Sequence, residues 1–117
     1  HTLGERIRAA RMMHGLTQKE AAQVLGVCPE TVLHWERGVT EPAASDYPAL
    51  VAFAGACILP QGDDLATRLV RCRLLLGLSR KAAAKDWGVD EETLAGWETG
   101  KAVTQARHRR LLERVLA

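Results

Sequence analysis

Apolar side chains recur at helical spacing in two short stretches near the start of the chain. Ala21, Ala22 and Leu25 fall on one face of a helix, and Val32 and Trp35 lie three residues apart further along. Residues three or four apart share a face of an α-helix, whereas the faces of a strand alternate every residue. The pattern therefore predicts two consecutive short helices, each with one inward side.

The residues between and around these stretches mark where the helices begin and end. Thr17 and Glu20 have the spacing of a capping box, in which each side chain bonds the backbone N–H of the other. Gly26 supplies the left-handed backbone that ends a helix, Pro29 is suited to the first turn of the next, and Gly38 ends that one. Two short helices joined by a glycine-containing turn make a helix-turn-helix, whose second helix can enter a DNA major groove.

The same pattern occurs a second time. When the chain is shifted by 62 residues, segment 79–100 falls on segment 17–38 without a gap. Over 3–55 against 65–117, 17 of 53 pairs are identical, and a match at one fixed offset marks an internal repeat. The repeat predicts an all-α fold with two tandem helix-turn-helix domains, at 1–55 and 65–117, and a short apolar join at 56–64.

Further helices are expected outside the two motifs. One spans about 3–14 and is capped by Thr2, one begins at Asp46, one spans about 65–76 behind Asp63 or Asp64, and the last spans about 104–116. One more short turn between Arg37 and Asp46 is expected, at a place that the pattern leaves open. The inward residues expected in the outer helices are Leu3, Ile7, Ala10, Leu50, Phe53, Ala54, Leu111, Leu112, Val115 and Leu116. In the join, Cys57, Ile58 and Leu59 are expected to be buried.

Composition supports the helical interpretation and narrows the function. Apolar residues make up 47% of the chain and aromatic residues 4%, without Val/Ile/Thr-rich alternation. The net charge of +2 is only weakly basic. No apolar run approaches the length of a membrane span and no signal-peptide pattern occurs, so a cytoplasmic protein without a membrane partner is expected.

The sequence offers little for catalysis or metal binding. The three cysteines, Cys28, Cys57 and Cys72, are odd in number and form no CxxC pair, so neither a disulfide framework nor a zinc site is expected. There is no nucleotide-binding loop and no paired-carboxylate constellation. We therefore expect a protein that is not an enzyme and that binds no cofactor and no metal.

The first motif and its surroundings resemble a known family. Arg11, the run Gly15-Leu16-Thr17-Gln18, Ala22, Gly26-Val27, Thr31 and Trp35-Glu36-x-Gly38 are similar to the helix-turn-helix domain of lambda-repressor-like, Xre-type transcriptional regulators. The resemblance covers the first unit and, more loosely, the second. It implies a bundle of about five helices per unit, sequence-specific binding of double-stranded DNA with the helix from about Pro29 to Arg37, and usually a homodimer.

The resemblance also implies roles for individual residues. Gln18 would bond a phosphate and brace the second helix, and Thr31 and Arg37 would touch the DNA backbone. Cys28, Pro29, Glu30 and His34 occupy the outward positions that face base edges, although Glu30 and His34 also fit an ordinary solvated surface. The full set of expected DNA-binding residues is Thr17, Gln18, Lys19, Cys28, Pro29, Glu30, Thr31, His34 and Arg37. Internal ion pairs are expected between Arg11 and Glu36 and between Arg73 and Glu98.

The second copy keeps the inward residues but changes the outward ones. At the reading positions it has Asp90, Glu91, Glu92 and Gly96, which offer carboxylates or no side chain to DNA. Asp90 is expected to cap its helix, and Arg80, at the position of Gln18, to contact phosphate but not to brace the helix in the same way. The second unit is therefore expected to be structural or dimerising. Secondary contacts to the DNA backbone are expected from Arg80, Lys81, Lys101, Arg107, Arg109 and Arg110.

The balance of basic and acidic residues in the first unit also fits a second function. Up to Ala44 the first unit has five basic and five acidic residues, so a single copy should bind DNA weakly. A homodimer is expected, with its contacts in the second unit or the join. The rival function is a protein-interaction or antitoxin-like module, whose bundles bind a protein partner.

Overall fold

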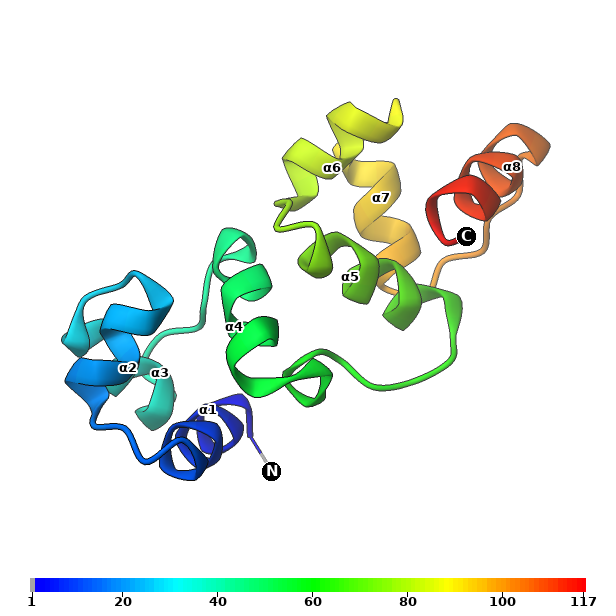
Figure 1. Ribbon diagram of the computed structural model, residues 1–117. Helices are drawn as coiled ribbons and strands as arrows, with labels where there is room; N and C mark the ends of the chain where they lie inside the picture. Colours follow the sequence, from blue (N-terminus) through cyan, green and yellow to red (C-terminus); the bar gives the residue numbers. More distant parts are fainter. Residues whose placement is uncertain (1) are drawn as a thin grey trace. The chain divides into compact units, whose positions relative to one another are not determined.

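The computed structural model describes residues 2–117, over which it contains eight α-helices, two 3₁₀ helices and no strand (Figure 1). The all-α prediction is confirmed. The chain divides into two compact units, of which the first ends at Leu59 and the second is Pro60–Ala117. Each unit has four α-helices rather than about five, because the segments that follow the third and seventh helices contain no further α-helical turn before the next helix.

Unit 1 is built around a core at the crossing of its helices. Its elements are α1 (Leu3–Met13), α2 (Gln18–Leu25), α3 (Pro29–Arg37) and α4 (Tyr47–Ala54), with 3₁₀ helices at Ala44–Asp46 and Ala56–Ile58. Ile7, Trp35, Leu50 and Ile58 form the buried cluster, and Val32 is also fully buried. The inward face that the 3.6-residue period predicts for α3 is therefore confirmed.

Local capping explains the helix boundaries of unit 1. Thr2 Oγ1 accepts the Glu5 N–H at the start of α1. At the start of α2, Thr17 Oγ1 accepts the Glu20 N–H at 3.1 Å, while the Glu20 carboxylate accepts the Thr17 N–H at 3.0 Å. This is the predicted capping box. Gly26 ends α2 with φ 72° and ψ 29°, a left-handed conformation that costs glycine little.

A glycine also permits the close approach of α1 and α3. A Cβ placed on Gly4 would lie 2.7 Å from the backbone oxygen of Glu36 and closer still to that of Trp35. Neither oxygen belongs to a flexible side chain, so a methyl group cannot be accommodated without moving a helix. The corresponding residue of unit 2 is Ala66, so the repeat does not preserve this contact.

The segment that ends unit 1 corrects one expectation. Ile58 and Leu59 are buried as predicted, but Cys57 is exposed, because the 3₁₀ turn faces only part of this run inward. The backbone oxygen of Cys57 accepts a hydrogen bond from Arg6 Nη1 at 2.7 Å. Phe53 is half-buried rather than central, and its ring lies 4.8 Å from that of His14 at the end of α1.

Unit 2 also contains four α-helices and has a buried core of its own. Its helices are α5 (Leu65–Leu75), α6 (Arg80–Trp87), α7 (Glu91–Glu98) and α8 (Ala106–Val115). Leu69, Ala83, Ala84, Leu94, Trp97 and Leu112 form its buried cluster. Trp97 is 5% exposed and Trp35 is 4% exposed, so both tryptophans are core residues, as the spacing predicts.

Capping in unit 2 departs from the prediction at one helix. Asp64, rather than Asp63, caps α5 by accepting the Thr67 N–H, and Ser79 Oγ accepts the Ala82 N–H at the start of α6. Asp90 stands at the N-cap of α7 but makes no side-chain cap bond. The expectation that Asp90 caps this helix is therefore wrong, because a capping residue must also adopt the rotamer that reaches the N–H groups of the first turn.

Within residues 2–117, no helix is both long and apolar enough to cross a membrane.

Candidate nucleic-acid interface

The outer face of α3 is available to a partner because the opposite face is fixed in the core. Val32 is fully buried and Trp35 nearly so, which orients the helix about its axis. The exposed residues are Cys28, Pro29, Glu30, His34 and Arg37 on or next to α3, and Thr17 and Lys19 at the start of α2. Thr31 and Gln18 are half-buried. The structure thus brings all nine residues expected to bind DNA onto two adjacent helices.

A network of side chains links the end of α3 to α1 and α2. Arg11 Nε donates to Glu36 Oε2 at 2.7 Å and Nη2 donates to Oε1 at 3.0 Å, a two-point pairing of guanidinium and carboxylate. Arg11 Nη1 also donates to the backbone oxygen of Leu16 at 2.9 Å. The hydrogen bond to Glu36 raises the pKa of Arg11 above its ordinary value. Gln18 Nε2 completes the network, 3.3 Å from Glu36 Oε1.

The second unit contains the same network with one change. Arg73 Nε donates to Glu98 Oε2 at 2.8 Å, Nη2 donates to Oε1 at 3.2 Å, and Nη1 donates to the Leu78 backbone oxygen at 2.9 Å. Arg80 Nε lies 3.1 Å from Glu98 Oε1. Arg80 thus contacts Glu98 through a charged group, whereas Gln18 contacts Glu36 through a neutral amide, because the longer side chain of Arg80 reaches the corresponding carboxylate. Both ion pairs that the repeat predicts are present.

A further cation, Arg8, which is not among the residues expected to bind DNA, lies beside the network. A shallow pocket of about 210 Å³ is lined by Arg8, Arg11, Gln18, Leu33, Glu36 and Arg37. Arg8 and Arg37 are exposed cations on α1 and α3, so they adjoin Gln18 at the same place. The available signal was the spacing of Arg8, three residues before Arg11, which puts both arginines on neighbouring positions of one helix.

The corresponding surface of unit 2 is partly covered. Gly96, at the position of His34, is buried, and a Cβ placed on it would lie 3.1 Å from Cδ of Lys101. The Lys101 N–H also donates to the Gly96 backbone oxygen at 2.9 Å. The aliphatic part of Lys101 therefore lies over the centre of α7, and the exposed residues at the start of that helix are Glu91 and Glu92. This surface offers an approaching phosphate mainly carboxylates.

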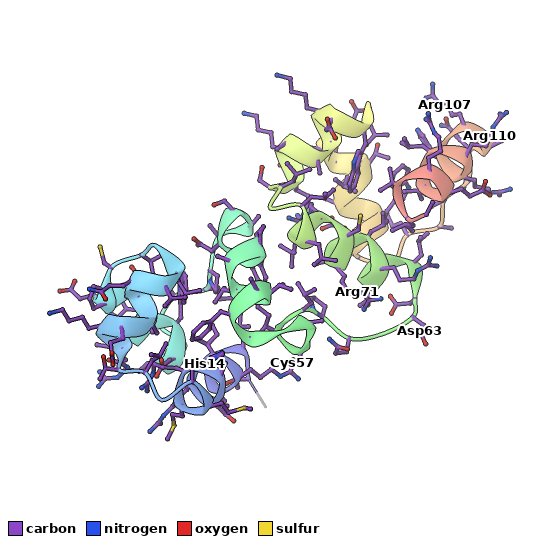
Figure 2. All side chains as sticks on the ribbon, in the orientation of Figure 1. His14, Cys57, Asp63, Arg71, Arg107 and Arg110 are labelled. Atoms are coloured by element: carbon purple, nitrogen blue, oxygen red, sulfur yellow. The ribbon has the colours of Figure 1, made fainter. Side chains whose placement is uncertain are left out.

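Basic residues are distributed unequally between the units. Unit 1 has five Lys and Arg against six Asp and Glu, a net charge of −1, whereas unit 2 has eleven against eight, a net charge of +3. Arg107, Arg109 and Arg110 are exposed on α8, where Figure 2 labels Arg107 and Arg110. Arg107 Nε donates to Gln105 Oε1 at 2.8 Å and Arg109 Nε to the Val103 oxygen at 3.3 Å. Arg80, Lys81 and Lys101 are exposed elsewhere in unit 2.

Potential metal ligands do not form a cluster in the described part of the chain. Residues 2–117 contain no group of three or more His, Cys, Asp or Glu side chains that could bind a metal ion. Cys28, Cys57 and Cys72 are free thiols. Burial raises the pKa of the Cys72 thiol, which disfavours the reactive thiolate.

Comparison with known proteins identifies the first unit. Residues 7–53, from the middle of α1 to α4, match the model of a helix-turn-helix family. This segment is a helix-turn-helix domain of the Xre, lambda-repressor-like type. The match does not extend into unit 2. A search of curated proteins found no significant match, and a search of solved structures likewise found none.

Proposed function

We propose that this protein is a transcriptional regulator that binds double-stranded DNA in a sequence-specific manner and reads the major groove with α3. The observation that carries the proposal is the exposed polar face of α3, which the Arg11–Glu36–Gln18 network fixes against α1 and α2. Regulators need a rigid reading helix, since base contacts discriminate only when their geometry is reproducible. The match of residues 7–53 to a helix-turn-helix family supports the same conclusion.

The exposed residues of α3 suggest a division between base and backbone contacts. Glu30 can accept a hydrogen bond from a cytosine amino group, His34 can donate to guanine, and Pro29 can contact a thymine methyl group. Cys28 contributes a small side chain at the same edge. Thr17, Gln18, Lys19, Thr31 and Arg37 surround these positions and would contact phosphates. Arg8 joins them through the pocket that it shares with Gln18 and Arg37.

We further propose that unit 2 is a divergent second copy of the domain and serves mainly as a scaffold. Support comes from the repeat and from the shared network of Arg73, Glu98 and Arg80. Lys101 covers the centre of α7 and carboxylates occupy its exposed start, so the helix is poorly suited to a groove. Secondary contacts to DNA phosphates would come from Arg80, Lys81, Lys101, Arg107, Arg109 and Arg110.

A pair of variants tests which unit reads DNA. Gln18→Ala combined with His34→Ala should abolish sequence-specific binding, whereas Glu91→Ala combined with Glu92→Ala should leave affinity unchanged or raise it. The target is first selected from a random duplex pool, and all proteins are then compared at one salt concentration because affinity depends steeply on salt. Loss of specificity in the glutamate variant alone would assign the reading to unit 2.

One observation favours a second candidate function, a protein-interaction or antitoxin-like module. Unit 1 has a net charge of −1, which is unusual for a surface that must approach DNA. If no duplex is enriched from the random pool while the folded protein captures a defined protein partner through α3, this candidate replaces the first. The protein-interaction candidate would be rejected if the unmodified chain enriches one DNA motif and the variant with Gln18→Ala and His34→Ala no longer binds that motif.

A further inference from the structure

Unit 2 contains a cleft that has no role in reading DNA. It lies between the end of α6, the start of α7 and one side of α8, and has a volume of about 600 Å³. Pockets that bind small organic ligands have volumes of roughly 300–1,000 Å³. All of its lining residues belong to unit 2, and of these only Arg107 is also among the residues proposed above to contact DNA phosphates.

One wall of the cleft is a stripe along α8. Arg107, Leu111 and Arg114 follow the spacing i, i+4, i+7, so they share one face of the helix, and all three line the cleft. A half-buried leucine thus lies between two exposed arginines. Among residues 2–117, the Arg114 side chain has no hydrogen-bond or ion-pair partner, and Arg107 uses its Nε–H for Gln105 Oε1.

The opposite wall comes from the other two helices and is apolar only in part. Trp87 and Val89 are half-buried and pack against the edge of the unit 2 core, while they also line the cleft. Asp90 and Thr93 follow on α7 as polar lining residues. The cleft therefore combines an apolar surface of aromatic and aliphatic groups with two guanidinium groups and one carboxylate, a net charge of +1.

The repeat shows that these residues are specific to unit 2. At the positions of Arg107, His108, Leu111 and Arg114, unit 1 has Ser45, Asp46, Ala49 and Ala52. The change replaces one acidic and three small residues by two arginines, a histidine and a leucine. At the position of Trp87, unit 1 has Leu25, which packs against its core. The second unit therefore has larger and more basic side chains at the positions that line this cleft.

We infer that this cleft binds a small organic anion, a carboxylic acid with an apolar body of one ring or a short chain. The apolar body would lie between Trp87 and Leu111, where its burial contributes in proportion to the area removed from water. The carboxylate would accept hydrogen bonds from Arg107 or Arg114, whose planar guanidinium matches a carboxylate in two-point geometry. Such a ligand would link α8 to α6 and α7 and so stabilise unit 2.

Binding to the chain of 117 residues is measured through the tryptophan indole N–H signals in proton–nitrogen NMR spectra. Trp87 is half-exposed in the cleft, whereas Trp35 and Trp97 are only 4% and 5% exposed. Cyclohexanecarboxylate is the probe, cyclohexanecarboxamide is its neutral counterpart, and acetate is the anion without an apolar body. The probe should move the Trp87 signal saturably with a Kd of about 1 mM or tighter, and each control should bind at least about 10-fold more weakly.

Variants locate the site. Arg107→Gln combined with Arg114→Gln should weaken binding of the probe by at least about 10-fold, because the charge-assisted hydrogen bonds are lost. Arg110→Gln removes a cation from α8 outside the lining of this cleft, and should bind the probe within about 2-fold of the unmodified chain. Equal binding of acid and amide, an unmoved Trp87 signal, or unchanged affinity in the double variant would each overturn the inference.

Discussion

The two ion-pair networks provide a matched test of how the protein tolerates a buried charge. Arg11→Met in unit 1 and Arg73→Met in unit 2 remove equivalent guanidinium groups. In unit 1 the remaining Glu36 side chain is 4% exposed, and its one other partner in the network is the neutral amide of Gln18 at 3.3 Å. Removing one member of a buried pair costs about 3–5 kcal/mol, so Arg11→Met should reduce the stability of unit 1 by that amount.

The cost in unit 2 should be smaller because a second cation remains. After Arg73→Met, the Glu98 carboxylate still lies 3.1 Å from Arg80 Nε. The Arg80 side chain is 48% exposed, so solvent screens its attraction, and a contribution of about 1 kcal/mol is expected from such a pair. Arg73→Met should therefore destabilise unit 2 by about 1 kcal/mol less than Arg11→Met destabilises unit 1.

Exchanging the residues at the equivalent positions 18 and 80 should exchange the sensitivity of the two units to loss of their buried arginine. Arg80→Gln in the Arg73→Met background should add about 1 kcal/mol to the cost, and Gln18→Arg in the Arg11→Met background should recover a similar amount. Urea unfolding is followed through the NMR signals of Trp35 for unit 1 and Trp97 for unit 2. With a slope of about 1 kcal/mol/M for small domains, the differences correspond to shifts of about 1 M in the midpoint.

Two results together would refute the reasoning. Arg11→Met and Arg73→Met would reduce the free energy of unfolding of their units equally, and Arg80→Gln would have no further effect in the Arg73→Met background. That result would mean that Arg80 does not compensate the buried Glu98 carboxylate. If Arg11→Met unfolds unit 1 completely, the comparison is repeated with Arg11→Lys and Arg73→Lys. These variants keep the charge but lose the two-point geometry, and the same order of costs is expected.

Three further predictions concern the capping box, the crossing of α1 and α3, and assembly. The N–H and hydroxyl groups of Thr17 lower the pKa of Glu20 below its ordinary value of 4.5. The stability that Glu20 adds relative to Glu20→Gln should thus be present above that value and disappear as the pH falls through the lowered pKa, as urea unfolding between neutral and acidic pH would show. Gly4→Ala should destabilise unit 1 by about 1–3 kcal/mol or more in thermal unfolding, since the methyl group meets backbone oxygens; an unchanged Tm would show that the helices move apart freely. The chain should be a homodimer in light scattering at tens of micromolar, since the ten residues 55–64 extend to only about 33 Å whereas adjacent half-sites lie about 34 Å apart. A monomer both free and on its DNA target would contradict this last prediction.

Much of the fold could be predicted because it depends on local interactions. The capping box at Thr17 and Glu20, the left-handed Gly26 and the inward pair Val32 and Trp35 each involve residues within one helical turn or at its ends. The positions of these residues in the chain specify the contacts almost completely. The Arg11–Glu36 pair spans 25 residues, yet the repeat made it predictable because the same pair recurs at the same spacing as Arg73 and Glu98.

The tertiary structure decided what depends on side-chain reach and on distant neighbours. Arg80 braces α7 because its longer side chain spans to Glu98, and Asp90 leaves its helix uncapped although its residue type favours a cap. Gly96 is covered by Lys101, and Arg8 lines one pocket with Gln18 and Arg37 next to α3. The cleft of unit 2 likewise exists only because three helices bring Trp87, Leu111 and Arg114 around one space. Sequence spacing determines which face of a helix a residue occupies, but the packing of whole helices determines what that face meets.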